Sequence, residues 1–318
     1  MLGEELAAVR CDLEDFAAEM FEPFARAEQR RWGEVYLRGL LLDGGRKSVE
    51  PMAARLGEDG NRQALAHFVT TSPWDAAHVR ARLAWRMQPV NKPTALIIDD
   101  TGFLKDGGAS ACVTRQYTGT AGKVTNCQAG VSLHLASHNA SAAVNWRLFL
   151  PESWDPAASK ADPVKVARRT SCAGSARPVQ WREGSRPGSG RSGHKRMYSR
   201  FVALRIRPAG REIRKATAGT ELPVRWLLTE WPAAEDEPVQ FWLSNLPENT
   251  PLPVLVRTAK LRWRIENDYR EMKQALGLAH FEGRTWPGWH HHVTLVSVAH
   301  AFCTLQRLGR SPKETASA

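Results

Sequence analysis

The first 90 residues carry a hydrophobic pattern that is typical of helices. Apolar side chains recur every three or four positions, which places them on one face of an α-helix. Ser48 is a suitable N-cap for a later helix, and the short helices after it are broken at Gly60 and at Ser72-Pro73. These short helices fit either a helix-turn-helix-like DNA-binding module or an ordinary helical bundle. The first apolar series consists of Leu6, Val9, Leu13, Phe16 and Met20.

The pattern changes at Pro93 and predicts a sheet. A continuous apolar run over 94–98 ends in Asp99 and Asp100, as expected for a buried central strand with carboxylates at its C-terminal end. A glycine-containing turn over 119–126 separates the next two predicted strands. The strands predicted after the first are 111–117, 128–136 and 145–150.

Beyond Pro151 the regular pattern is lost, and Gly, Ser, Pro and Arg dominate 171–193, a composition typical of a linker. Periodicity then returns, first strand-like and later helical. The predicted fold class is therefore α/β. The later predicted strands are 200–207, 224–231 and 239–243, and the predicted helices are 253–276 and 289–308. The predicted organisation is a helical region (1–90), a sheet domain (91–170), a basic linker (171–199), an inserted β segment (200–248), C-terminal helices (249–308) and a tail (309–318).

The net charge of +11 is concentrated in one stretch of the 318 residues. Fourteen Lys or Arg residues lie between Arg168 and Lys215, against only two acidic residues, Glu183 and Glu212. The stretch therefore carries a charge of +12, and the rest of the chain is nearly neutral. Such a concentration of positive charge predicts a nucleic-acid partner, although a solvated basic linker has the same composition.

Cysteine spacing and hydropathy indicate a cytoplasmic protein. The five cysteines are scattered and none forms a CxxC pair, so neither a zinc ribbon nor a disulfide framework is predicted. No run of about 18 apolar residues is present. The acidic N-terminal sequence differs from a signal peptide. We therefore expect a cytoplasmic location and no membrane partner.

Two segments far apart in the sequence carry residues suited to phosphodiester chemistry. One is the acidic pair after the apolar run of 94–98. The other is a predicted helix on which Arg262, Glu266, Tyr269 and Lys273 fall within about 60° of one another. Taken alone, this helix fits an ordinary surface helix with ion pairs between successive turns. Taken together, a strand carboxylate and a helix carboxylate can hold the divalent cations used in DNA cleavage and strand transfer.

The acidic segment belongs to a longer motif, LIIDDTGFLK followed by RQYTGTAGKVTNCQAGVSLHLAS and LFLPESWD. It resembles the start of the catalytic domain of DDE-type insertion-sequence transposases, and RWRIENDYREMKQALGLAHFEGR resembles the C-terminal signature of that family. The resemblance covers nearly the whole chain. It implies that Asp100 is the first metal ligand and Glu266 the third, and that Arg262 and Lys273 contact DNA phosphates. The position of the family's tyrosine is occupied by Ala259.

The resemblance also implies a fold, a cofactor and partners. The expected fold is an RNase H-like mixed sheet with a helical N-terminal region and an inserted β segment. Two Mg²⁺ ions are expected to activate the nucleophile and stabilise the leaving oxygen. The implied partner is double-stranded DNA, both transposon ends and target, with Lys195 and Arg196 of the basic stretch among the contacts. A homodimer on DNA and a nucleoid-associated location are further expectations.

One element of the family pattern is missing. The family places a second aspartate on a strand between the two motifs, and nothing between Leu150 and Arg200 resembles it. The chain resembles the family just upstream of that strand and then well downstream of it, with the junction at 172–177. We interpret this as an internal deletion that removes a strand, a helix and the second ligand. The nearest acidic residues, Asp155 and Asp162, lie in proline-flanked loops and are not expected to replace it.

We therefore expect a transposase with an incomplete RNase H-like sheet and impaired catalysis. The alternative is a non-catalytic DNA-binding remnant or a repressor of intact transposases. A third interpretation is a chain that folds poorly, because losing a strand exposes a sheet edge. His290-His291-His292 cannot all face one ion on a helix, so we interpret them as a helix start that packs on the core or contacts the DNA backbone.

Overall fold

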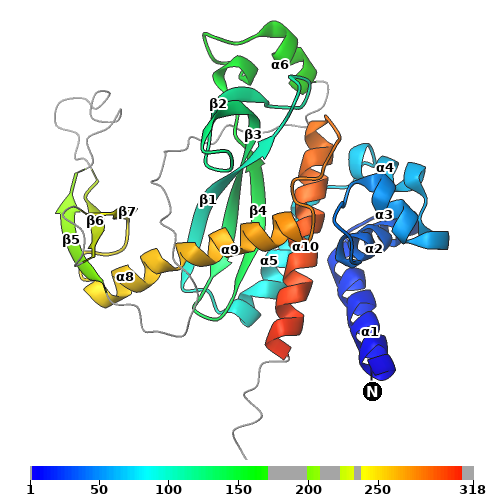
Figure 1. Ribbon diagram of the computed structural model, residues 1–318, viewed down its shortest axis with the longest axis horizontal. Coiled ribbons are helices and arrows are strands. Elements are labelled where there is room, and N and C mark those ends of the chain that lie inside the picture. The colour runs from blue at the N-terminus through cyan, green and yellow to red at the C-terminus, as the bar shows by residue number, and fades with distance from the viewer. Residues whose placement is uncertain (1, 171–198, 208–222, 233–237, 310–318) are drawn as a thin grey trace, which may run out of the picture. The chain divides into compact units, whose positions relative to one another are not determined.

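The computed structural model describes residues 2–170, 199–207, 223–232 and 238–309. The chain divides into two compact units (Figure 1), one comprising Met1–Val179 and Trp263–Ala318, the other Gln180–Arg262. Within the described residues, the first unit contains the N-terminal helices, a four-stranded sheet and the C-terminal helices. The second contains a three-stranded sheet and a helix.

The N-terminal region is helical, as its hydrophobic pattern predicts. Side-chain caps begin two of the helices, because Asn61 accepts from the Ala64 amide and Asp75 accepts from the Ala77 amide. None of the described helices is long and apolar enough to cross a membrane. The elements are α1 (Leu2–Phe21), α2 (Ala27–Leu41), α3 (Val49–Arg55), the short η1 (Gly57–Asp59), α4 (Arg62–Thr70) and α5 (Ala76–Asn91).

The central sheet is antiparallel in all of its described strands, so the mixed sheet implied by the resemblance is not seen there. Its strands are β1 (Ala95–Leu104), β2 (Thr114–Thr118), β3 (Lys123–Ala136) and β4 (Ser141–Leu148). β3 pairs along one edge with β1 and along the other with β2 and β4. The predicted turn of 119–126 is too long, because Lys123 to Asn126 already pair with β2.

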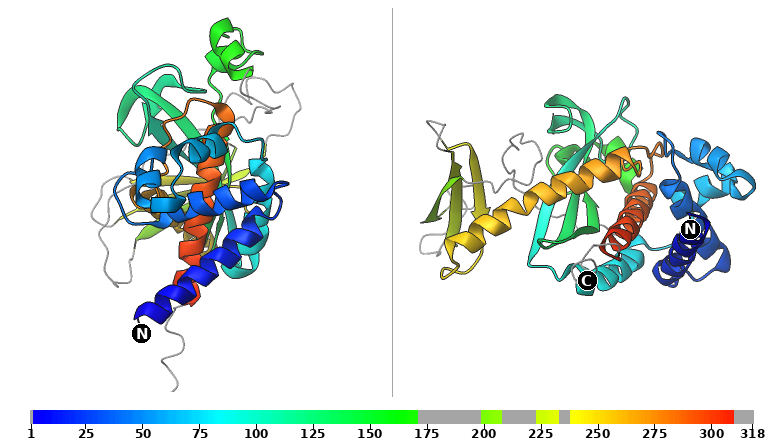
Figure 2. Two further views of the ribbon diagram at one scale, coloured as in Figure 1. Left: turned by 90° about the vertical axis from the view of Figure 1, so that its right-hand side faces the viewer. Right: turned by 60° about the horizontal axis from the view of Figure 1, so that its bottom comes forward.

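Two C-terminal helices cover one face of this sheet (Figures 1 and 2). They are α9 (Arg262–Gln274) and α10 (Trp286–Gly309). Trp289 of α10 packs edge-on against Phe103 of β1 and Trp146 of β4, and the Trp146 indole donates to Ser297 Oγ at 2.8 Å. Gly130 of β3 leaves room for these rings, because a Cβ there would lie 2.7 Å from Phe103 and 2.8 Å from Trp289.

Three consecutive histidines near the start of α10 are buried in the core, which confirms the core-packing interpretation of His290-His291-His292. Burial lowers the pKa of the first to about 3 and of the other two to about 4. Their ring nitrogens lie within 3.0 Å of the backbone carbonyl oxygens of Trp286, Val69, Trp74 and Gly277. Across the described residues, no three His, Cys, Asp or Glu side chains are arranged to hold a metal ion.

The chain after 151 is more regular than its composition predicts. η2 (Glu152–Trp154) and α6 (Pro163–Thr170) form in the part where we expected no pattern. Asp162 explains the start of α6, because its carboxylate accepts from two backbone N–H groups of the first turn. Asp155 accepts from the Ala157 amide at 3.1 Å. Both carboxylates therefore accept hydrogen bonds from backbone amides a few residues further along the chain.

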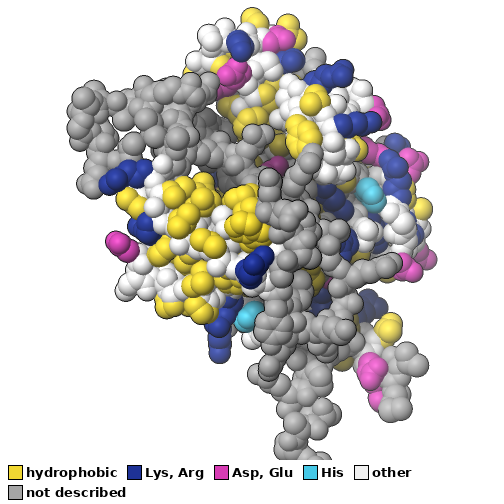
Figure 3. Space-filling view, turned by 60° about the vertical axis from the view of Figure 1, so that its left-hand side comes forward, with side chains coloured by type: hydrophobic (Ala, Val, Ile, Leu, Met, Phe, Trp, Pro, Cys, Tyr) yellow, Lys and Arg dark blue, Asp and Glu magenta, His cyan; other side chains and the backbone are white. Residues whose placement is uncertain are grey.

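The second unit is a three-stranded antiparallel sheet with one helix on one of its faces. Its elements are β5 (Arg200–Ile206), β6 (Arg225–Trp231), β7 (Gln240–Ser244) and α8 (Leu252–Lys260), in the sheet order β5-β6-β7. Lys260 of α8 pairs with Glu230 of β6 at 2.7 Å and lies over the rings of Phe201 and Trp242. The other face presents an apolar patch (Figure 3) of side chains that are at least 43% exposed: Val202, Leu204, Phe241 and Leu243.

Candidate functional site

Asp99 and Asp100 point to opposite faces of β1. The register pairs Asp99 with Ser132 and Asp100 with Val131, and successive residues of a strand alternate between its faces. Asp99 is only 5% exposed and lies on the face that α9 covers. Asp100 is exposed and shares the other face with Ile98. The two acidic residues of the motif are therefore in different environments.

Two side chains, one helical turn apart, hold α9 against the sheet beside these carboxylates. The Tyr269 hydroxyl lies 2.6 Å from Oγ of Ser132 on β3. The Lys273 ammonium donates to the carbonyl oxygen of Gly102 and to Thr120 Oγ1, both at 3.1 Å. Because Gly102 follows the acidic pair by two positions on β1, this side of α9 lies along the acidic part of β1.

Glu266 is on the same side of α9. At 100° per residue, it is displaced by about 20° from Lys273 and by about 60° from Tyr269. Burial raises the pKa of Tyr269 well above its ordinary value, and the negative charges of Asp99 and Asp100 raise it further. The hydroxyl three residues after Glu266 is therefore within electrostatic reach of both β1 carboxylates. The fold thus brings the two segments singled out in the sequence together.

The structure describes only some of the residues that are predicted to contact DNA. Lys273 donates to internal acceptors, and burial lowers its pKa to about 8, so here it anchors α9 to β1. Arg262 is the first residue of α9 and is half-buried. Lys195 and Arg196 lie outside the described residues, as does the expected deletion junction at 172–177. Their DNA contacts remain predictions.

Among the described strands, β1 is an edge strand and not the central strand that its apolar run predicts. It pairs only with β3. Leu96 and Ile98, on the face away from α9, are 65% and 53% exposed. An apolar strand at an edge with one open face is consistent with the deletion interpretation, which stays a prediction.

Comparison with known families decides where the chain belongs. A family model described as DDE superfamily endonuclease matches residues 19–183, more than half of the chain. The chain belongs to the DDE superfamily endonucleases. The matched part of the chain contains β1 with both aspartates and ends before α9 begins.

A curated relative of this chain comes from an insertion sequence. The "Probable transposase for insertion sequence element IS701" of Microchaete diplosiphon is 41% identical to this chain over 98 residues. The match covers 30% of this chain and 26% of the relative, so it spans about a quarter of the relative's length. Family and relative together confirm the resemblance to DDE-type insertion-sequence transposases.

DDE endonucleases generally use divalent metal ions, and the carboxylates of this chain suit such ions. Asp99, Asp100 and Glu266 supply hard oxygen donors, the type that Mg²⁺ prefers. Burial is the main cause of the raised pKa of Tyr269, and the negative charges of Asp99 and Asp100 beside α9 raise it further. No three acidic, His or Cys side chains within the described ranges already converge as ligands. The donor chemistry of this chain therefore fits a divalent cation, while the ligand set is partial.

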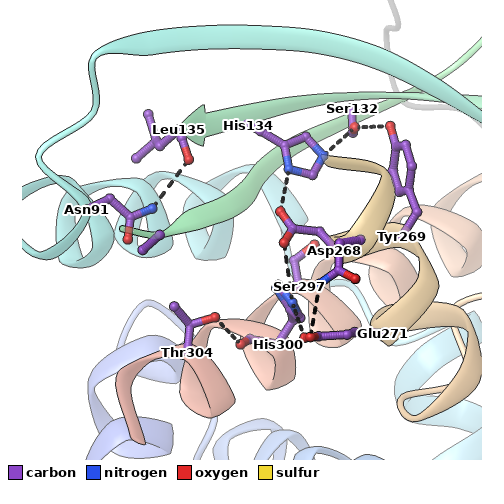
Figure 4. Close-up of polar contacts among 12 residues, drawn as sticks. Asn91, Ser132, His134, Leu135, Asp268, Tyr269, Glu271, Ser297, His300 and Thr304 are labelled. Carbon is purple, nitrogen blue, oxygen red and sulfur yellow. Dashed lines mark hydrogen bonds and ion pairs between the residues drawn. The ribbon is translucent and has the colours of Figure 1, made fainter. Parts of the chain in front are cut away.

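A buried polar network joins α9 to β3 and α10 (Figure 4). His134 lies between Ser132 Oγ, 2.8 Å from Nε2, and the Asp268 carboxylate, 3.3 Å from Nδ1. The other oxygen of Asp268 is 3.8 Å from Nε2 of His300, which also lies 3.2 Å from the Glu271 carboxylate. Sequence analysis missed this network. Its only signal was Ser132 and His134 at alternating positions of a largely apolar strand.

Glu271 forms the outer end of the network. Its carboxylate accepts two hydrogen bonds from the Arg307 guanidinium, at 2.9 and 2.7 Å. Hydrogen bonds from His300 and from Arg307 lower the pKa of Glu271 to about 2. Glu271 therefore ties α9 to α10.

Proposed function

We propose that this chain is an insertion-sequence transposase of the DDE type, with an RNase H-like catalytic sheet and impaired strand cleavage. One observation carries the proposal: Tyr269 and Lys273 hold α9 beside the acidic part of β1, and Glu266 shares their side of the helix. The family match and the relative named as a transposase support it. Double-stranded DNA as partner, a homodimer on DNA and a nucleoid-associated location belong to the same proposal.

By the family resemblance, Asp100 and Glu266 are the residues that would hold the cation, Mg²⁺ in the cell, although strand register places Asp100 on the face of β1 away from α9. When bound there, the cation would polarise a phosphodiester and lower the pKa of the attacking water. Asp99 competes with Asp100 for the ligand role, because strand register points Asp99 toward α9. Lys273 keeps α9 at a fixed distance from β1 through Gly102.

Impaired cleavage follows from the missing second aspartate. Two-metal cleavage needs carboxylates that hold both ions about 3.5–4 Å apart, and Asp155 and Asp162 are committed to local backbone N–H groups. The second candidate function is a DNA-binding remnant or repressor. The charge of +12 over 168–215 favours it, because binding through phosphates needs no catalytic carboxylate.

The cation site can be tested by titrating the full chain with Mn²⁺ in a calorimeter. Asp100→Asn and Glu266→Gln should each weaken binding by at least about tenfold, because even loss of an outer-shell partner costs that much. Asp155→Asn is the matched control and should leave binding unchanged. A larger loss in Asp99→Asn than in Asp100→Asn would reassign the first ligand. Unchanged affinity in Asp99→Asn, Asp100→Asn and Glu266→Gln would reject the site.

A further inference from the structure

Four buried side chains close a ring of polar contacts between one turn of α9 and one face of β3 (Figure 4). Asp268 and Tyr269 are adjacent on α9, and Ser132 and His134 point to the same face of β3. The Tyr269 hydroxyl is 2.6 Å from Ser132 Oγ, which is 2.8 Å from His134 Nε2. His134 Nδ1 is 3.3 Å from the Asp268 carboxylate. None of the four residues is more than 7% exposed.

A neutral imidazole sets the direction of the hydrogen bonds. The Asp268 carboxylate then accepts from His134 Nδ1–H, and Nε2 accepts from the Ser132 hydroxyl. The Ser132 oxygen then accepts from the Tyr269 hydroxyl. The phenol is therefore the first donor of the chain. Replacing it with a phenyl ring would remove one donor and leave the rest of the ring in place.

The ring restrains the rotation of α9 about its own axis. Asp268 and Tyr269 leave the helix about 100° apart, and both are tied to β3. Rotating the helix in either direction would lengthen one of the two contacts. Burial makes such a loss costly, because a polar group without a partner cannot turn to water instead.

This restraint acts beside the candidate cation site. Ser132 is the register partner of Asp99, and Glu266 is one turn before Tyr269 on α9. A rotation of α9 would therefore swing the Glu266 carboxylate away from β1. Lys273, one turn after Tyr269, ties the same side of the helix to the carbonyl oxygen of Gly102 on β1.

We propose that Tyr269 is a positioning residue, whose hydroxyl fixes the rotation of α9 through Ser132 and so holds Glu266 toward the carboxylates of β1. The inference rests on the proposed function, since it concerns the same cation site. The aromatic ring has a separate role, because it packs edge-on against His134 and lies tilted against Trp146. Core filling belongs to the ring and positioning to the hydroxyl, so Tyr269→Phe separates the two.

Tyr36 provides a matched control. Its hydroxyl is also buried and lies 2.9 Å from a histidine nitrogen, Nδ1 of His292. This bond joins α2 to α10, and neither helix carries a proposed ligand. Tyr36→Phe therefore removes a buried tyrosine–histidine hydrogen bond without touching α9.

The experiment measures Mn²⁺ affinity by calorimetry, amide hydrogen exchange across Ile265 to Met272, and the melting temperature of the full chain. Tyr269→Phe and Ser132→Ala should both weaken Mn²⁺ binding by about tenfold, the lower end for loss of an outer-shell partner. Both should also speed exchange in α9. Tyr36→Phe should lower the melting temperature but leave affinity and α9 exchange unchanged.

Two results would overturn the inference while leaving the proposed function intact. One is normal affinity in Tyr269→Phe when Glu266→Gln has lost binding. The other is equal weakening in Tyr269→Phe and Tyr36→Phe, which would show general destabilisation. If the unmodified chain binds no Mn²⁺, the proposed cation site is rejected. The restraint on α9 is then tested by amide hydrogen exchange alone. Faster exchange in both Tyr269→Phe and Ser132→Ala then supports the restraint, and unchanged exchange rejects it.

Discussion

Asp99 of β1 and Ser132 of β3 are partners in the antiparallel register, and both point to the face covered by α9. This relationship places the buried carboxylate of the acidic pair next to the side chain that anchors Tyr269. The acidic pair and the polar network of α9 are therefore neighbours.

Binding to duplex DNA should weaken steeply as salt rises. Each neutralised phosphate releases counterions, so the logarithm of affinity should fall linearly with the logarithm of salt between about 50 and 200 mM. Lys195→Ala and Arg196→Ala should each reduce that slope by about 0.9. Arg10→Ala, which removes a partner of Glu14 on α1, is the control and should change nothing. A slope of zero for the unmodified chain would show that it does not bind DNA through charged contacts with phosphates.

The purified chain should not cleave or join transposon ends with Mg²⁺ or Mn²⁺. Without the second aspartate, either activation of the nucleophile or stabilisation of the leaving oxygen is lost, and each contributes several kcal/mol to lowering the barrier. Since about 1.4 kcal/mol is tenfold in rate, activity should fall by several orders of magnitude.

The control for that assay is an intact relative with all three acidic residues on the same DNA ends. Robust metal-dependent cleavage by this chain, lost in Asp100→Ala, would show that another group has replaced the missing ligand.

Gly130→Ala should destabilise the first unit. The added Cβ would lie 2.7 Å from the Phe103 ring and 2.8 Å from the Trp289 ring, which are themselves packed together. Overpacking of this kind costs about 1–3 kcal/mol, measurable by urea unfolding. Gly107→Ala is the control, because a Cβ there meets nothing within 4 Å. Equal stability of Gly130→Ala and the unmodified chain would show that the sheet and α10 can separate at no cost.

Stability should decline as the pH falls from about 6.5 toward 4. Burial lowers the pKa of His292 to about 4 in the folded chain, whereas an unfolded histidine has a pKa of about 6.5. Below 6.5 the unfolded state binds the proton first, so this contribution is complete above 6.5 and is lost as the pH falls. Unfolding midpoints measured in steps from pH 7 to about pH 2 test this.

His292→Gln keeps a polar side chain but removes the group that binds the proton. The unfolding free energy of this variant should therefore fall less steeply with pH, by the contribution of one proton. The loss due to Glu271, whose folded pKa is about 2, should appear separately below about 4.5. Glu271→Gln should therefore change only the more acidic window. An identical pH profile in His292→Gln and the unmodified chain would contradict the assignment of the first window.

Much of the secondary structure could be predicted from the sequence. The three strands of the second unit and α10 appear close to their predicted positions, because helical and strand periodicities are local properties. The single helix predicted over 253–276 is two helices, α8 and α9, which are separated at Leu261. α6 was missed, because its first turn depends on a cap by Asp162 in a stretch without an apolar stripe. The length of β3 was underestimated, because only pairing with β2 shows that Lys123 to Asn126 continue the strand.

By itself, the sequence determined the family, the acidic pair on a strand and the helix that carries Glu266, since motifs and periodicity are written along the chain. Tertiary structure decided which acidic residue of the pair faces α9, because a shift of one residue in strand register exchanges the two faces. It also decided the contact of His134 with Asp268, which are 134 positions apart. No local pattern encodes such a contact, because it depends on how α9 lies across β3. The arrangement around the candidate site is therefore a property of packing.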